Sequence, residues 1–224
     1  MENNKYSAVV FDMDGTILDT LEDLAASINF ALKTNDFPER SIDEVRGFVG
    51  NGLVKLVERA VPDCTLPEEN QKVLETFNDY YKNHCSEKTK PYPGIIDVLN
   101  RLKKCGIKVA VCSNKPDYGV KTLCKEHFNG IFDIALGIKD GLKTKPHPDT
   151  VNEILKQLKC KKENAVYVGD SEVDIQTAKN AGIKCISVCW GFKTKDFLLQ
   201  NEAERIVENA EELYNAIITT APSM

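Results

Sequence analysis

Residues 9–20 read VVFDMDGTILDT, and this stretch decides how the rest of the chain is interpreted. The apolar residues 9–11 are typical of a strand inside a sheet, and they lead directly to two acidic residues, Asp12 and Asp14. An ionised carboxylate is costly to bury unless a cation or hydrogen bonds compensate its charge. The stretch therefore predicts a buried strand whose end must pair two carboxylates with something else.

Further apolar runs indicate more strands of the same sheet. They are continuous rather than alternating, as expected for strands buried on both faces of a parallel sheet. The expected strands are residues 6–12, 107–113, 164–170 and 183–189, with a fifth at 205–209. The later strands are separated or followed by helical patterns at residues 94–105, 116–127, 147–159, 171–181 and 209–218. Strands that alternate with helices predict an α/β fold with a doubly wound, Rossmann-like parallel sheet.

The segment at 94–105 shows how the helices are read from the sequence. We expect Ile96, Leu99 and Leu102 to share its buried face, because they recur at helical spacing. Gly106 follows as the expected cap of the carboxyl end.

Residues 18–90 break the alternation of strand and helix. Helical patterns at 19–35, 41–49, 51–61 and 67–85 follow one another there without a convincing strand. An interval of about 70 residues is far too long for a simple connection between neighbouring strands. We therefore expect a core domain formed by residues 1–17 and 88–224, and a helical cap domain inserted at residues 18–87.

The composition is that of an ordinary folded protein, with 42% hydrophobic and 28% charged residues among 224. The formal net charge of −5 argues against a general nucleic-acid or anionic-membrane binder, since either would favour a basic face. No apolar stretch approaches the roughly 18 residues that span a bilayer, and no signal-peptide core follows Met1. We expect a cytoplasmic protein without nucleic-acid or membrane partners, present as a monomer or homodimer.

Polar residues follow three of the expected strands at the point where each strand ends. They are Asp12 and Asp14 after the first, Ser113 and Asn114 after the second, and Asp170 and Asp174 after the third, with Lys145 in the segment before the third. The carboxyl ends of parallel strands share one edge of the sheet, so these side chains are expected in one crevice. Clustered carboxylates favour Mg²⁺, whereas a lysine with hydroxyl and amide donors favours an anion. A metal-binding group of carboxylates beside an anion-binding group of donors predicts phosphoryl transfer. No P-loop sequence is present to bind the phosphate, and an aspartate can instead serve as the nucleophile.

Four stretches carry a resemblance to a known family. They are FDMDGTILDT (11–20), VCSNK (111–115), KTKPHP (143–148) and VYVGDSEVDIQTAKNAG (166–182). In this order they resemble the four motifs of the haloacid dehalogenase-like hydrolase superfamily, whose members have an α/β core that carries an inserted cap. RGFVGNGLVKLVERAV (46–61) and YPGIIDVLNRLKKCGIKVAVCSNK (92–115) are similar to the phosphoglycolate phosphatase-like subgroup.

The resemblance implies a role for each matching residue. Asp12 would be the nucleophile that attacks phosphorus, and Asp14 the general acid and base. Mg²⁺ would be bound by Asp12, the backbone carbonyl of Asp14 and Asp170, with Asp174 in support. The transferring phosphoryl group would be bound by Ser113 and Lys145, and the pocket completed by Asn114, Gly15 and Thr16.

The cap segment around RGFVGNG leaves two interpretations open. Gly50 and its neighbours form either a loop that faces the site or an ordinary turn between helices. In the first case Arg46, Asn51 or Lys55 would contact the leaving group, for example a substrate carboxylate. In the second case their charges are solvated.

The expected activity is that of a Mg²⁺-dependent phosphatase acting on a small phosphorylated metabolite, with phosphoglycolate as the first candidate. A β-phosphoglucomutase-type phosphotransferase would use the same core, although Thr16 and the cap loop favour hydrolysis. Pyrophosphate and nucleoside monophosphates are alternative substrates. A non-catalytic regulatory protein is disfavoured, because every catalytic position is present.

Overall fold

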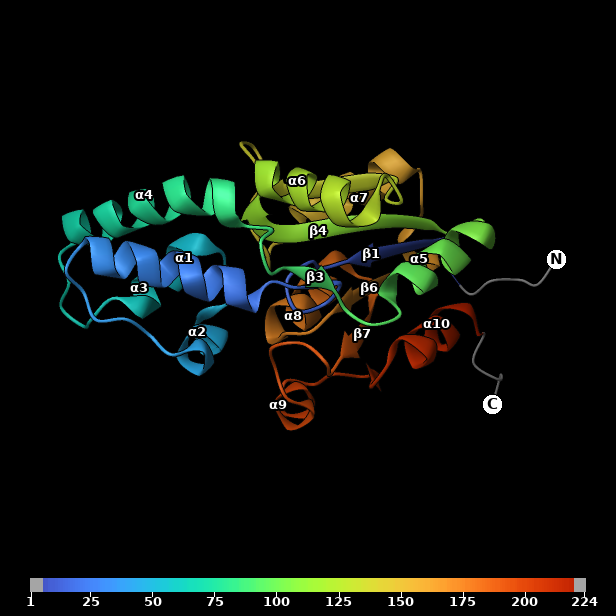
Figure 1. Cartoon of the computed structure of the whole chain (residues 1–224). Coiled ribbons are helices and arrows are strands. Elements are labelled where there is room, and N and C mark those ends of the chain that lie inside the picture. The colour runs from blue at the N-terminus through green and yellow to red at the C-terminus, as the bar shows by residue number, and fades with distance from the viewer. Residues whose placement is uncertain (1–5, 220–224) are drawn as a thin grey trace.

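The chain folds around a six-stranded parallel sheet, which a computed structural model describes within residues 6–219 (Figure 1). The strands lie in the order β5-β4-β1-β6-β7-β8, so the first strand of the chain is at the centre. Their bounds are β1 (Ala8–Phe11), β4 (Lys108–Pro116), β5 (Ile134–Ile138), β6 (Ala165–Gly169), β7 (Lys184–Val188) and β8 (Ile206–Val207). The predicted α/β class is confirmed.

Alternate residues of the central strand face opposite sides of the sheet, and both sides are covered. Val9 and Phe11 belong to one apolar cluster, whereas Ala8 and Val10 belong to another. The first cluster includes side chains of α5 (Ile95–Lys104), α6 (Asp117–Phe128) and α10 (Ala210–Ile218). The second includes side chains of α7 (Asp149–Leu158) and α8 (Glu172–Ala181). This double cover explains why the strands read as continuous apolar runs.

Two local predictions were incomplete or wrong. Strand β5 was not predicted, because it lies at the sheet edge, contains Gly137 and leaves Ile138 exposed. In α5, Ile96 is 40% exposed and does not share the buried face with Leu99 and Leu102. The buried stripe begins one residue earlier, at Ile95, and follows the spacing expected of a helix face.

The insertion after β1 forms a lobe of four helices, which we call the helical lobe. Its members are α1 (Leu21–Thr34), α2 (Ile42–Phe48), α3 (Leu53–Ala60) and α4 (Pro67–His84). Figure 1 shows this lobe beyond one end of the sheet, with the two long helices α1 and α4 side by side. Its buried side chains are continuous with the apolar cluster on one face of the sheet.

A two-stranded antiparallel ribbon marks where the chain leaves the core and returns. It consists of β2 (Leu18–Asp19) and β3 (Lys90–Pro91), which the sequence pattern did not predict because each has two residues. Asp23 in α1 joins the two crossings, which are the segments where the chain passes from the core to the lobe and back. Its carboxylate is buried and accepts hydrogen bonds from the backbone N–H of Lys88 at 3.0 Å and of Thr89 at 2.8 Å. The entry and exit of the lobe are therefore tied together.

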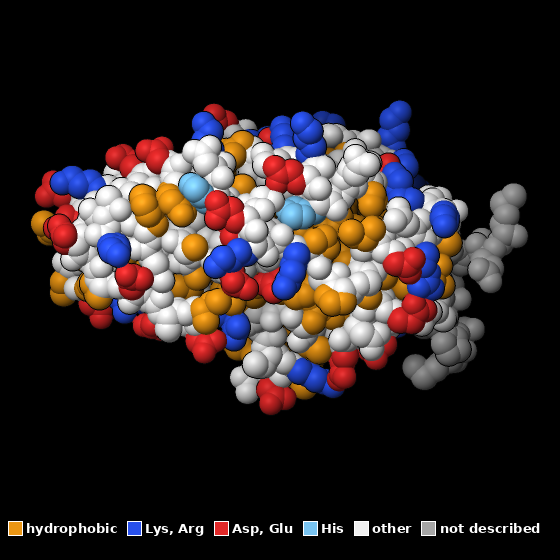
Figure 2. All heavy atoms as spheres, viewed as in Figure 1, with side chains coloured by type: hydrophobic (Ala, Val, Ile, Leu, Met, Phe, Trp, Pro, Cys, Tyr) orange, Lys and Arg blue, Asp and Glu red, His pale blue; other side chains and the backbone are white. Residues whose placement is uncertain are grey.

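Charges of both signs are interspersed over the face of the molecule in Figure 2. The remaining short elements are η1 (Lys162–Asn164) and α9 (Lys195–Gln200). Within residues 6–219, no helix combines the length and the apolar character needed to cross a bilayer.

Candidate active site

The carboxyl ends of three neighbouring strands meet at the edge of the sheet that faces the helical lobe. Asp12 follows β1 directly, Asp170 follows β6 directly, and Ser113 and Asn114 lie near the end of β4. A cavity lies at this edge, as expected for an open parallel sheet. The core residues that line it are Asp12, Asp14, Ser113, Asn114, Lys115, Lys145, Asp170, Ser171, Phe192 and Lys193.

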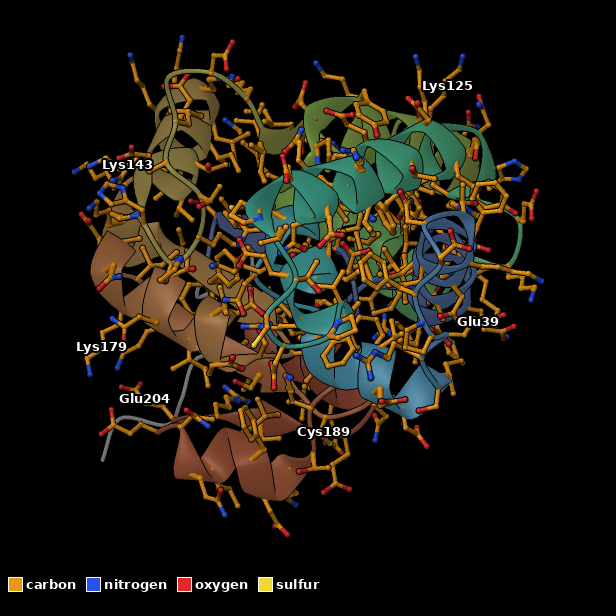
Figure 3. The ribbon with its side chains drawn as sticks, turned by 90° about the vertical axis from the view of Figure 1, so that its left-hand side faces the viewer. Glu39, Lys125, Lys143, Lys179, Cys189 and Glu204 are labelled. Carbon is orange, nitrogen blue, oxygen red and sulfur yellow. The ribbon has the colours of Figure 1, made fainter. Side chains whose placement is uncertain are left out.

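Lys145 is the central cation of this site. Its Nζ lies 2.8 Å from Oδ1 of Asp12 and 2.8 Å from Oδ1 of Asp174, and donates to the Tyr167 hydroxyl at 3.1 Å. Burial acts to lower the pKa of Lys145, but Asp12 and Asp174 outweigh it and raise that pKa above its ordinary range. Lys143, two residues earlier, is exposed at the outer edge of the molecule in Figure 3. The motif therefore places one of its two lysines inside.

Asp12, Asp170 and Asp174 form a buried acidic cluster, in which one carboxylate oxygen of each lies within 4.8 Å of the others. Burial and the charge of Asp174 raise the pKa of Asp12 to about 7. Burial and the charges of Asp174 and Asp12 also raise the pKa of Asp170 well above its usual range. A bound cation would relieve this repulsion, and an all-oxygen donor set suits a hard divalent ion.

The hydrogen bonds of the cluster distinguish its members. Asp174 has both oxygens engaged, Oδ1 by Lys145 and Oδ2 by Ser171, whose Oγ donates at 2.6 Å at the start of α8. Oδ2 of Asp170 accepts the N–H of Phe192 at 2.7 Å. Oδ1 of Asp170 has only a long contact of 3.4 Å with Thr16 Oγ1, so Asp12 and Asp170 are more available to a metal than Asp174, which orients Lys145.

Two glycines allow the chain to pack closely around Asp170. Gly15 has φ +82°, and a Cβ there would lie 2.3 Å from Oδ2 of Asp170. A Cβ at Gly191 would lie 2.3 Å from the carbonyl oxygen of Gly15. Trp190 anchors the same loop, because its Nε1 donates to the Thr16 carbonyl at 3.0 Å. Gly15 and Thr16 therefore shape the site from behind the cavity lining, and Thr16 Oγ1 lies 3.4 Å from Oδ1 of Asp170.

Asp14 contacts a second lysine. Its Oδ1 accepts a hydrogen bond from Thr20 Oγ1 at 2.6 Å and lies 3.1 Å from Nζ of Lys115. Lys115 was not among the predicted site residues, although it directly follows Ser113 and Asn114. Burial acts to lower the pKa of Lys115, but Asp14 and Tyr81 outweigh it and raise that pKa above its ordinary range.

Ser113 and Asn114 differ in what they contact. Asn114 clamps the backbone of Lys145, with Oδ1 accepting its N–H at 2.8 Å and Nδ2 donating to its carbonyl at 3.0 Å. Ser113 Oγ accepts the N–H of Lys115 at 3.1 Å and lines the cavity. Ser113 is therefore placed to contact a ligand, whereas Asn114 mainly fixes the lysine that does so.

The predicted cap residues are not brought together. Gly50 lines the cavity, but Arg46 pairs with Asp43 at 2.9 Å and lies in a separate surface groove. Lys55 pairs with Glu58 at 2.5 Å, and Asn51 Oδ1 accepts a hydrogen bond from Arg59 at 2.8 Å. The lobe instead lines the cavity with Leu24, Val49, Gly50, Gly52, Leu53 and Leu56. Its contribution is apolar side chains and backbone rather than charge.

Comparisons with known proteins agree with this geometry. The profile of the haloacid dehalogenase-like hydrolases matches residues 9–188. The chain is 31% identical over 211 residues to phosphoglycolate phosphatase 1 of Pseudomonas aeruginosa, covering 92% of this chain and 77% of that protein. It is also 31% identical over 214 residues, 95% of either chain, to a Caldanaerobacter subterraneus subsp. tengcongensis protein provisionally named pyrophosphatase PpaX.

A solved structure extends the likeness to the whole fold. A crystal structure of a protein provisionally named phosphoglycolate phosphatase, from Lactobacillus delbrueckii subsp. bulgaricus, superposes with a TM-score of 0.93 at 39% identity. The match covers 96% of this chain and 100% of that one. The sheet, its inserted helices and the acidic cluster at the strand ends agree with these similarities, and the chain belongs to the haloacid dehalogenase-like hydrolase family.

Proposed function

We propose that this protein is a Mg²⁺-dependent phosphatase that hydrolyses small phosphate monoesters through an aspartyl-phosphate on Asp12. The observation that carries the proposal is the ion pair between Asp12 and Lys145 beside the carboxylate of Asp170. One lysine, together with the cation that the two carboxylates would bind at the same strand edge, can neutralise a phosphoryl group while leaving an aspartate oxygen to attack it.

The metal would be bound by Asp12, Asp170 and the backbone carbonyl of Asp14. When bound, Mg²⁺ supplies positive charge to the phosphoryl oxygens. Lys145 and Ser113 contribute the remaining donors on the protein side, and Asp174 holds Lys145 in place. The all-oxygen donor set is the observation that supports Mg²⁺ over softer ions.

The reaction takes two steps. In the first, a carboxylate oxygen of Asp12 bonds to phosphorus, the ester P–O bond breaks, and Asp14 gives its proton to the departing alkoxide. In the second, Asp14 takes a proton from water, the water oxygen bonds to phosphorus, and the bond to Asp12 breaks. Inorganic phosphate leaves, and both carboxyl groups return to their starting states.

Phosphoglycolate is the first substrate to test, because relatives at about this identity bear that name. Its carboxylate requires a cation in the lining of the cavity. Lys145 and Lys115 are both paired with carboxylates, so Lys193, whose Nζ lies 5.4 Å from the centre of the Phe197 ring, is the lysine we assign to this contact. The apolar lining from the lobe suits a small leaving group.

The test is release of inorganic phosphate from p-nitrophenyl phosphate with and without Mg²⁺. We expect Mg²⁺-dependent turnover by the wild type and a loss of about 10³-fold or more in Asp12→Asn. Asp97→Asn, an exposed aspartate in α5, is the matched control and should keep full activity. An inactive wild type, or full activity of Asp12→Asn, would overturn the proposal.

A substrate panel then tests the finer assignment. It contains phosphoglycolate, hexose phosphates, pyrophosphate and nucleoside monophosphates, with conversion of glucose 1-phosphate to glucose 6-phosphate followed separately. Preference for phosphoglycolate supports the assignment. Preference for pyrophosphate, net mutase turnover or a flat profile would reject it while leaving the phosphatase chemistry intact.

A further inference from the structure

Lys115 occupies a position that the proposed chemistry does not use. It is the second-last residue of β4, and its side chain is 1% exposed. Nζ lies 3.1 Å from Oδ1 of Asp14, and it donates a hydrogen bond to the hydroxyl of Tyr81. Nζ also lies 4.7 Å from the centre of the Tyr81 ring, within the range of a cation–π contact. One buried ammonium group thus joins a carboxylate of the core to a tyrosine of the helical lobe.

A buried ammonium needs compensation, and these two contacts supply it. Asp14 provides the opposite charge when it is ionised, and its Oδ1 remains an acceptor when the carboxyl group carries the proton, while Tyr81 provides an oxygen acceptor and the face of its ring. Tyr81 is itself fully buried and stacks on Phe77 at 5.2 Å between ring centroids. The contacts with Asp14 and Tyr81 therefore restrict the rotamer of Lys115.

Tyr81 lies where α4 approaches the core. It precedes the end of the helix at His84, shortly before the chain returns through β3. The other crossing also reaches Asp14, since Thr20 directly precedes α1 and donates to the same Oδ1. Both crossings between lobe and core thus end on one oxygen of one carboxylate, Thr20 directly and Tyr81 through Lys115.

We infer that Lys115 is a positioning residue, which fixes the Asp14 carboxyl group for proton transfer and does so through its contact with Tyr81 of the helical lobe. This inference rests on the proposed function, in which Asp14 protonates the leaving oxygen. Loss of the contact leaves Asp12, Lys145 and the acidic cluster in place. It selectively impairs the step that needs a proton at the leaving oxygen.

Substrates with different leaving groups separate this role from a general structural one. An alkyl phosphate releases a strongly basic alkoxide and needs the acid, whereas p-nitrophenolate departs without it. The parameter kcat/KM covers the steps up to departure of the leaving group, so it isolates this difference. The measurement is the ratio of kcat/KM for phosphoglycolate to kcat/KM for p-nitrophenyl phosphate.

Three variants test the inference. Lys115→Met removes the charge, and we expect its kcat/KM to fall about 30-fold or more for phosphoglycolate but less than about threefold for the aryl ester. Tyr81→Phe keeps the ring and removes only the hydroxyl, so the same ratio should fall about threefold to tenfold. Lys121→Met, an exposed lysine six residues later in α6, is the control and should keep the wild-type ratio.

The outcomes are distinguishable from failure of the proposed function. If the wild type hydrolyses both esters but the ratio is unchanged in Lys115→Met and in Tyr81→Phe, the positioning inference is wrong and the phosphatase proposal stands. An equal loss on both substrates in both variants also overturns it, because a merely structural residue behaves in that way. If Lys115→Met does not fold, Tyr81→Phe decides alone. A wild type inactive on both esters overturns the two proposals together.

Discussion

The two aspartates of the first motif are each paired with a lysine and a tyrosine, but the two sets are built differently. Asp12 is held by Lys145, which also contacts the hydroxyl of Tyr167 in β6. Asp14 is held by Lys115, which contacts the hydroxyl of Tyr81 in the helical lobe. The first set lies entirely in the core, whereas the second spans the core and the insertion.

The difference separates the contacts of Asp12, which involve only core residues, from those of Asp14, which depend on the helical lobe. Lys145 is shared by two carboxylates and clamped at its backbone by Asn114, so the lysine beside the proposed nucleophile Asp12 is held by residues of the core alone. Lys115, the lysine beside Asp14, is held in part by Tyr81 of α4. In the proposed mechanism, attack on phosphorus and protonation of the leaving group therefore have different structural supports.

The largest effect is expected from breaking the core set. Lys145→Met removes the cation between Asp12 and Asp174, so kcat/KM should fall about 10²- to 10³-fold on aryl and alkyl esters alike. The free energy of unfolding should fall by about 3 kcal/mol in urea titrations of the metal-free protein, because two buried carboxylates lose their partner. Lys143→Met, the exposed lysine of the same motif, should match the wild type in both measurements. A loss confined to the alkyl ester would contradict the proposed division between the two sets.

A smaller effect is expected from loosening the lobe at its attachment. Asp23→Ala removes the acceptor of the backbone N–H groups of Lys88 and Thr89, and should lower the free energy of unfolding by about 2 kcal/mol. We expect kcat/KM for phosphoglycolate to fall about tenfold and that for p-nitrophenyl phosphate to fall much less. Glu39→Ala, an exposed acidic residue in the loop after α1, is the control for stability and turnover. Equal losses on the two esters would show that the attachment does not act through Asp14.

The core set should also respond to metal and pH. The pKa of Asp12 is raised to about 7 by burial and by Asp174, so the metal-free protein holds a proton there that the unfolded chain loses near pH 4. Because the pKa of Asp12 is higher in the folded chain than in the unfolded chain, the free energy of unfolding of the metal-free protein should fall as pH rises from about 4 to 7. Mg²⁺ must displace that proton, so its apparent affinity should increase about tenfold between pH 5.5 and 7, measured by the shift in Tm with Mg²⁺ concentration. The increase should become smaller in Asp12→Asn, in which only the raised pKa of Asp170 still opposes metal binding, and an equal affinity at both pH values in the wild type would refute the assignment.

The smallest effect is expected at the cavity lysine that belongs to neither set. Lys193→Ala should raise KM for phosphoglycolate about fivefold and leave kcat nearly unchanged, because the lost contact is present in both ground and transition states. The values for p-nitrophenyl phosphate, which has no carboxylate, should stay within about twofold. Lys195→Ala, an exposed lysine paired with Glu208, is the control. An unchanged KM would show that a residue other than Lys193 contacts the substrate carboxylate.

Most of the core set was within reach of the sequence, because Asp12 follows an apolar run at the end of a parallel strand and Lys145 lies in a recognisable motif, although Tyr167 inside β6 was not predicted. Asp12, Asp170 and Lys145 are placed by local strand and loop signals, and the topology of the fold does the rest. The second set was not, since the role of Lys115 depends on Tyr81, which lies 34 positions away in another part of the fold. No periodicity in the sequence links the two.

The cap residues show the opposite difficulty. Arg46 and Lys55 carry charges of the right sign near a glycine-rich turn, and this made them candidates for binding a substrate carboxylate. In the structure each pairs with an acid three positions away on its own helix, Asp43 and Glu58. Such pairs on a helix surface are common and weak, so charge alone does not identify the side chains that face a cavity.

The tie between the crossings has a consequence for how such a protein changes over evolutionary time. Since β2 and β3 lie side by side and Asp23 joins the two crossings, the inserted helical lobe begins and ends at one place on the core. A lobe of different size and lining can be spliced between the same two points without disturbing the sheet. A replacement lobe must still present a hydroxyl to Lys115. Exchange of specificity is thus constrained mainly by one oxygen atom, and grafts that lack it should bind new esters but hydrolyse those with basic leaving groups about threefold to tenfold less efficiently relative to aryl esters.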